Sequence, residues 1–110
     1  MILFRVQLRI PPAVRDRVVQ SLLRMAGPAR AVKGCTACGV FMDVEDDNTL
    51  LYVEEWETQA AVDERLRAED LRVLLSALDL SSEPPVVRFE AVGETQGMEV
   101  IAAARAGTGR

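Results

Sequence analysis

The sequence contains no histidine, so it lacks the side chain that most often serves as a general base or a metal ligand in proteins. Cysteine is also scarce, because Cys35 and Cys38 are the only two. Two cysteines are too few for a disulfide scaffold, and a chain of 110 residues can form a core without one. We therefore expect neither a disulfide framework nor a histidine-based site, and no bound metal.

Long apolar runs and basic clusters are missing as well. No apolar run approaches the roughly 20 residues that a membrane-spanning helix needs. Residues 1–10 alternate charged with apolar side chains instead of forming the apolar core of a signal peptide. The net charge is −4 and the arginines are scattered among acids, which argues against binding to nucleic acid or anionic membranes. The sequence thus predicts a cytoplasmic protein with no nucleic-acid or membrane partner.

The composition that remains is typical of one globular domain. Of the 110 residues, 49% are hydrophobic and 27% are charged, and two domains would each be too small. We expect a domain over residues 1–93. The tail, residues 94–110, fits either a short helix or an added strand, with a disordered end from Gly107.

The periodicity of apolar residues predicts four strands and two helical regions. Residues Ile2–Ile10 alternate as a half-buried strand, and Pro11 and Pro12 stop it. A helix follows from Ala13, and Gly27–Pro28 end or interrupt it. Three further strands are expected over residues 34–45, 50–56 and 86–92. Between the last two, Thr58 caps a second helix that turns Val62 and Leu66 inward, and further helical turns follow from Asp70.

This order, strand-helix-strand-strand-helix-strand, predicts an α+β fold of the ferredoxin-like βαββαβ type. Right-handed crossovers would place both helices on one face of a four-stranded antiparallel sheet. The strands carry apolar or mixed side chains on both faces, so the bare face is expected to pack against a second copy. The predicted assembly is a homodimer with two-fold symmetry.

The third predicted strand carries the best candidate site. Tyr52, Glu54 and Trp56 share one strand face, because side chains alternate along a strand. If that face lines an apolar pocket, Glu54 could accept a proton there. The structural alternative makes Trp56 a core residue and pairs Glu54 with Arg5 or Arg9 of the first strand.

The cysteines and the helical arginines have ordinary explanations. Cys35 and Cys38 have the spacing of a zinc or redox pair, but a zinc site would need further ligands, and positions three apart in a strand face opposite ways. We expect two small buried thiols, with a reactive Cys38 as the alternative. Arg65, Arg67 and Arg72 alternate with acids, which is typical of a solvated helix face. One of them closing over a pocket is the alternative.

Five parts of the chain carry a recognisable pattern, namely Gly34–Cys35, Asp43–Asp46, Glu54–Glu57, Ala61–Val62 with Leu66, and Ser82–Pro85. Together they resemble the antibiotic biosynthesis monooxygenase domain, whose relatives include small quinol monooxygenases and belong to the dimeric α+β barrel superfamily. The similarity covers roughly Ile2 to Val92.

The resemblance implies a cleft between sheet and helices in which a small aromatic or quinol-like substrate is oxidised by O2 without metal or flavin. Trp56, Tyr52 and Cys38 would contact the substrate, Glu54 would accept a proton or anchor a hydrogen bond, and Arg65 would hold an anion. Many relatives carry histidines where Arg65 and Asp70 stand, and arginine cannot act as a base near neutral pH. The proton-accepting role would then fall to Glu54. The alternative is a non-catalytic dimer that binds a small ligand or serves in a stress response.

Overall fold

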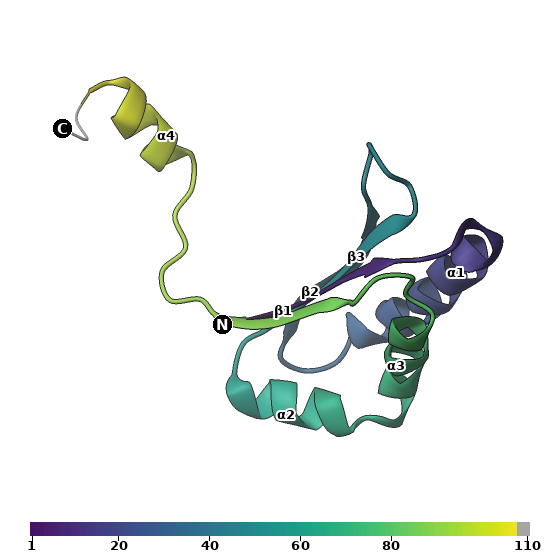
Figure 1. The fold of residues 1–110 in the computed structure, drawn as a ribbon. Coiled ribbons are helices and arrows are strands. Elements are labelled where there is room, and N and C mark those ends of the chain that lie inside the picture. Colours follow the sequence, from purple (N-terminus) through teal and green to yellow (C-terminus); the bar gives the residue numbers. More distant parts are fainter. Residues whose placement is uncertain (108–110) are drawn as a thin grey trace.

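The computed structural model describes residues 1–107, which form one four-stranded antiparallel sheet in the order β2-β3-β1-β4 with helices on one face (Figure 1). The elements are β1 (Ile2–Arg9), α1 (Pro12–Ala29), β2 (Cys35–Met42), β3 (Thr49–Trp56), α2 (Gln59–Arg67), the 3-10 turn η1 (Glu69–Leu71), α3 (Arg72–Asp79), β4 (Val86–Ala91) and α4 (Met98–Arg105). The predicted α+β, ferredoxin-like βαββαβ fold is therefore confirmed.

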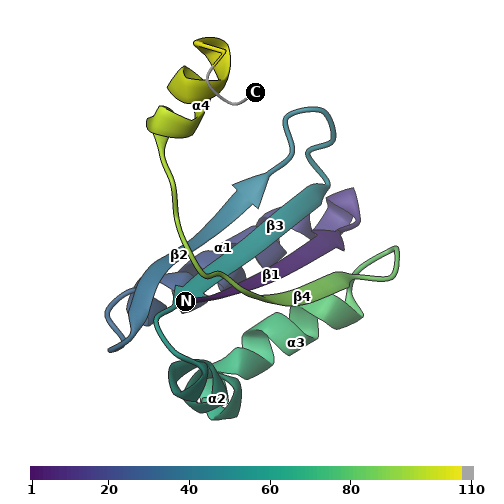
Figure 2. The ribbon, with the colours of Figure 1, turned by 90° about the vertical axis from the view of Figure 1, so that its left-hand side faces the viewer.

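The sheet has two unlike faces because side chains alternate along each strand. The even-numbered residues of β1 and β3 face the helices and are buried, from Phe4 to Leu8 and from Leu50 to Trp56. Helices α1 and α3 cover this face with Leu22, Met25 and Leu74, among others. No helix of the described chain covers the opposite face, which Figure 2 shows toward the viewer.

Helix α1 runs through Pro28 and ends at Ala29, so Gly27 and Pro28 do not end it as the sequence suggested they could. Pro28 lies in the last turn, where its missing N–H removes one hydrogen bond at most. Ala26 and Ala29 are both buried, and their packing favours the helical conformation to the end.

Helix α2 begins as predicted, with the Thr58 hydroxyl accepting a hydrogen bond from the Ala61 N–H at 3.1 Å. Its inward face was predicted incorrectly. Val62 is buried, but the second buried position is Arg65, whereas Leu66 is exposed. Arg65 can occupy an inward position because a buried carboxylate compensates its charge, as described below.

Of the two conformations expected for the tail, the structure forms a helix, α4, which lies beyond an irregular segment, residues 92–97. None of its residues is buried, and α4 stands away from the sheet in both views (Figures 1 and 2). Disorder was expected from Gly107 onward, but Gly107 lies in a turn after α4, where its N–H donates to the Ala104 carbonyl at 3.1 Å. The rest of that prediction falls on positions 108–110, which lie outside the described residues. Within residues 1–107, no helix has the length and apolarity to cross a membrane.

Candidate functional site

The buried face of β3 carries the candidate site. Tyr52, Glu54 and Trp56 all point toward the helices, and each is fully buried, with 0% of its surface exposed. A carboxylate at such a position is costly unless hydrogen bonds and an opposite charge compensate its lost hydration. The surroundings of Glu54 provide both.

Both carboxylate oxygens of Glu54 accept hydrogen bonds. The Trp56 indole N–H donates to Oε1 at 2.8 Å, and the Arg65 Nε donates to Oε2 at 2.9 Å. The Tyr52 hydroxyl donates to Oε2 as well. Since this uses the only phenolic hydrogen, the Cys38 thiol must be the donor in its 3.3 Å contact with the Tyr52 oxygen.

Arg65 links this buried network to the surface. Its Nη1 donates to Asp70 Oδ1 at 2.9 Å, and the side chain of Asp70 is 46% exposed. Its Nη2 is buried and has no hydrogen-bond partner among residues 1–107, which leaves a charged donor unsatisfied there. Buried polar groups without a partner are rare in folded proteins and often mark a place where a ligand or water binds.

The environment shifts two pKa values in the network. Burial raises the pKa of Tyr52 above its ordinary value, and its hydrogen bonds with Cys38 and Glu54 raise it further. Burial acts to lower the pKa of Arg65, but the charge of Glu54, the interaction with Tyr52 and the hydrogen bond that Arg65 donates to Glu54 raise it overall. The network therefore keeps a neutral phenol and a cationic guanidinium.

The structural alternative for Glu54 was half right. Trp56 is a core residue, but the partner of Glu54 is Arg65 of α2, not Arg5 or Arg9. Both of those β1 arginines are odd-numbered and lie on the opposite sheet face. There Arg5 pairs with Glu90 and Arg9 with Asp46.

The expected pocket at the aromatic residues is absent from the single chain. Trp56 and Tyr52 have no exposed surface, so neither lines a cavity that solvent can reach in the described residues. Their hydrogen bonds to Glu54 show what they do instead, which is to fix the carboxylate that pairs with Arg65.

The prediction that the two cysteines face opposite ways was wrong. A β-bulge at Thr36 sets Cys35 opposite Trp56 and Cys38 opposite Glu54. Because the bulge adds one residue to the strand, positions 35 and 38 face the same way, and both thiols lie on the helix side of the sheet. Burial raises the pKa of both thiols, which disfavours the reactive thiolate form of Cys38. Within the described chain, no group of three or more His, Cys, Asp or Glu side chains could hold a metal ion.

A pocket of about 440 Å³ lies at Arg65, between the C-terminal end of α1 and helix α2. This volume is within the range of small-molecule sites. Its lining residues are Pro28, Val32, Lys33, Ala61, Glu64, Arg65, Ala68 and Asp70. The pocket thus combines apolar walls with the arginine that carries the unpartnered donor.

Asp70 and Lys33 were not among the predicted site residues, although the family resemblance had pointed to the position of Asp70. Asp70 is five residues beyond Arg65, a spacing that no continuous helix would bring together. Helix α2 ends at Arg67, and the extended backbone of Ala68 turns η1 back so that Asp70 reaches Nη1. Lys33 comes from the loop after α1, and no periodic pattern marks it.

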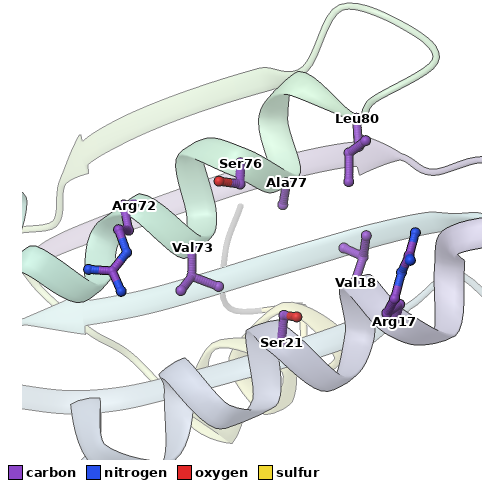
Figure 3. Close-up of a pocket in the computed structure, with 8 residues that line it drawn as sticks. All are labelled: Arg17, Val18, Ser21, Arg72, Val73, Ser76, Ala77 and Leu80. Carbon is purple, nitrogen blue, oxygen red and sulfur yellow. The ribbon is translucent and has the colours of Figure 1, made fainter.

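A second pocket, of about 350 Å³, lies between α1 and α3 (Figure 3). The buried residues Val18 and Ala77 line it together with Arg17 and Arg72. Both arginines are exposed to solvent, which already hydrates them. The pocket at Arg65 is therefore the better candidate site.

The comparisons with known proteins agree with this fold. Of the solved structures, a Deinococcus radiodurans protein assigned to the antibiotic biosynthesis monooxygenases superposes with a TM-score of 0.80 at 19% identity, covering 88% of this chain and 97% of that chain. Rv0793 of Mycobacterium tuberculosis superposes with a TM-score of 0.77 at 20% identity, covering 87% and 98%. At such identities these likenesses show the fold alone.

Two sequence comparisons extend the result. An uncharacterised Synechocystis protein, sll1783, is 22% identical over 90 residues, which are 81% of this chain but only 61% of that protein. This chain therefore spans about three fifths of that relative. The family model described as antibiotic biosynthesis monooxygenase matches residues 1–75, more than half of the chain. The chain belongs to the antibiotic biosynthesis monooxygenase family.

Proposed function

We propose that the chain is a cofactor-independent monooxygenase that oxidises a small hydroxy-aromatic or quinol-like substrate with O2 in the pocket at Arg65. Family membership supports the reaction type. The observation that carries the choice of site is that Arg65, whose buried Nη2 has no partner within residues 1–107, lines a pocket of about 440 Å³.

Arg65 is the substrate anchor in this proposal. A hydroxy-aromatic that loses a proton bears a negative oxygen, which a guanidinium binds strongly in a site that excludes water. Glu54 holds the guanidinium by accepting its hydrogen bond, and Tyr52 and Trp56 hold Glu54 in turn. These three residues thus act through Arg65 and do not themselves contact the substrate.

Asp70 is the better placed proton acceptor. Both oxygens of Glu54 already accept hydrogen bonds, whereas Asp70 lines the pocket and is partly exposed. Once Asp70 has accepted the proton it is neutral and pairs less strongly with Arg65, which would free Nη1 for the substrate oxygen. We therefore assign proton acceptance to Asp70 and the positioning of Arg65 to Glu54, which revises the role expected for Glu54.

The oxidation then follows from the electron-rich anion. The carbanion form of the substrate passes one electron to O2, and the resulting radical and superoxide combine into a peroxide on the ring carbon. Protonation and loss of water leave a carbonyl. One oxygen atom thus enters the product, the other leaves as water, and both hydrogens of the oxidised carbon end in that water.

The experiment is oxygen uptake with anthrone and 1,4-dihydroxynaphthalene, without added metal or flavin. We expect Asp70→Asn and Arg65→Lys to lower the rate by about 100-fold or more, the usual effect of losing one group that stabilises the transition state. Arg67→Gln is the matched control, because Arg67 is solvated on the same helix and should leave the rate unchanged.

A non-catalytic binding module is the second candidate. The fully buried Trp56 and Ala61, a lining residue of the pocket, would both lie within 4 Å of a Cβ built on Gly34, so the two residues are close to each other. Fluorescence from this single tryptophan therefore reports ligand binding. Quenching by these aromatics without oxygen uptake would favour the binding module. Uptake that is equal in all variants would contradict the assignment of the site.

A homodimer formed by the open sheet face is part of the proposal. Apolar residues of all four strands lie on this face, namely Leu3, Ala37, Phe41, Leu51, Val53 and Val86. Packing this face against the same face of a second copy, related by a two-fold axis, would remove these apolar side chains from water. The cytoplasmic location expected from the sequence stays a prediction.

A further inference from the structure

Helix α4 is short and mostly apolar, and residues 1–107 bury none of it. It has eight residues, and Met98 and Ile101 are 73% and 52% exposed. Isolated helices of fewer than about 12 residues are only marginally stable in water. A helix of this length is therefore stable only if its apolar side packs against another surface.

The position of α4 indicates which surface that is. The segment after β4 leaves the end of the sheet and passes in front of its open face (Figure 2). α4 lies on the side of the sheet opposite α1 and α3 and stands clear of the strands (Figure 1). Any molecule packed on the open face would lie next to this arm, which we define as residues 93–105.

The open face is only partly apolar. Arg5, Arg88 and Glu90 occupy the side of it that β1 and β4 form. A stable interface buries about 800 Å² of accessible surface on each partner, and its fully buried centre is depleted of charged residues. Apolar surface from the arm would therefore add to the part of this face that can be buried.

We propose that the arm of each copy packs the apolar side of α4 on a second copy, so that two arms clasp the dimer. This inference rests on the sheet-to-sheet homodimer proposed above. An anionic membrane fits less well, because Glu99 offsets Arg105 and α4 carries no basic cluster. The second copy supplies apolar surface at the place where the arm already projects.

The test is sedimentation equilibrium of the full chain and of the double variant Met98→Glu, Ile101→Glu. We expect the dimer dissociation constant to rise at least 10-fold, with the thermal stability of the remaining fold unchanged because α4 buries nothing in its own chain. Glu99→Gln is the matched control, since it changes a charge on the polar side and keeps an acceptor for the Gly97 N–H.

Two further measurements separate the possible failures. A chain ending at Gly93 should show the same weakened dimer, and isotope-filtered NOEs in mixed-labelled dimers should connect Ile101 methyls to the second copy. A full chain that is monomeric at tens of micromolar would overturn the sheet dimer and the arm together. If the double variant and the shortened chain both dimerise as tightly as the full chain, or if the NOEs stay within one copy, the packing of the arm on the second copy is wrong. The sheet-to-sheet dimer would then still stand.

Discussion

At the scale of single residues, the protein places a complete charge pair in its core. Glu54 and Arg65 are joined at 2.9 Å, and their side chains are 0% and 3% exposed. Replacing such a pair with apolar residues is often neutral for stability, whereas removing one member leaves an uncompensated buried charge. Stability alone therefore does not account for the Glu54–Arg65 pair. Its unpartnered donor supports our proposal that Arg65 binds a ligand.

Glu54→Gln should lower the free energy of unfolding by about 3–5 kcal/mol, because it leaves the Arg65 cation buried without its counter-ion. Urea denaturation at one fixed protein concentration measures this, since dimerisation makes stability depend on concentration. Glu55→Gln, on the opposite sheet face, should change it by less than about 1 kcal/mol. A Glu54→Gln protein as stable as the control would contradict the pairing.

The only tyrosine gives a second test at this scale. Because burial raises the pKa of Tyr52 above that of the unfolded chain, the folded state holds the phenolic proton more tightly. Its contribution to stability is complete below about pH 10, the ordinary pKa of tyrosine, and is lost as the pH rises above it.

Absorbance at 295 nm should therefore show no tyrosinate near pH 10 while circular dichroism still reports a folded chain. The free energy of unfolding should fall above pH 10 by up to about 1.4 kcal/mol per pH unit, and Tyr52→Phe should lack this slope. Reversible ionisation near pH 10 in the folded protein would show that the hydroxyl is not held as described.

At the scale of elements, the turn before β2 fixes helix α2 against the sheet. Gly34 has a φ of +93°, and a Cβ there would lie 3.0 Å from the Ala61 Cβ. Its carbonyl accepts a hydrogen bond from the Glu57 N–H at 2.8 Å. The turn, the end of β3 and the first turn of α2 therefore pack with no room for a side chain.

Gly34→Ala should cost at least about 1–2 kcal/mol of unfolding free energy, since a left-handed backbone is strained for any residue with a Cβ. Displacement of Ala61 should also change the fluorescence of Trp56, whose ring would lie 3.8 Å from the added Cβ. Gly93→Ala is the control, because nothing lies within 4 Å of a Cβ there. Equal stability of the two variants would rule out the close packing.

At the scale of the whole molecule, the sheet is covered on one side only. Phe41 lies on the open face and is 56% exposed, whereas Leu75 lies on α3 away from the sheet and is 52% exposed. The two residues are about equally accessible in the single chain, but only Phe41 lies on the face that we propose to form the dimer.

Phe41→Glu should therefore raise the dimer dissociation constant by at least 10-fold, because it places a charge in an apolar interface. Light scattering coupled to size-exclusion chromatography over a dilution series measures the change. Leu75→Glu should leave the dimer intact. If both variants dissociate alike, or neither does, the open face is not the interface.

Much of this architecture could be predicted from the sequence by itself. The alternation in Ile2–Ile10, the Thr58 cap and the break at Ser81–Pro85 are local signals. Local periodicity was sufficient to determine the buried faces of β1 and β3, but not that of α2, where Arg65 is buried and Leu66 is exposed. For the same reason, Tyr52, Glu54 and Trp56 could be assigned to one strand face before any contact was known.

Only the tertiary structure decided what that face contacts. The partner of Glu54 depends on how α2 crosses the end of the sheet, and the arrangement of the cysteines depends on one bulged residue. Asp70 reaches Arg65 through a chain reversal between α2 and α3, so the pocket is formed by segments distant in sequence. Such contacts arise from packing between elements, and no periodicity within a single element encodes them.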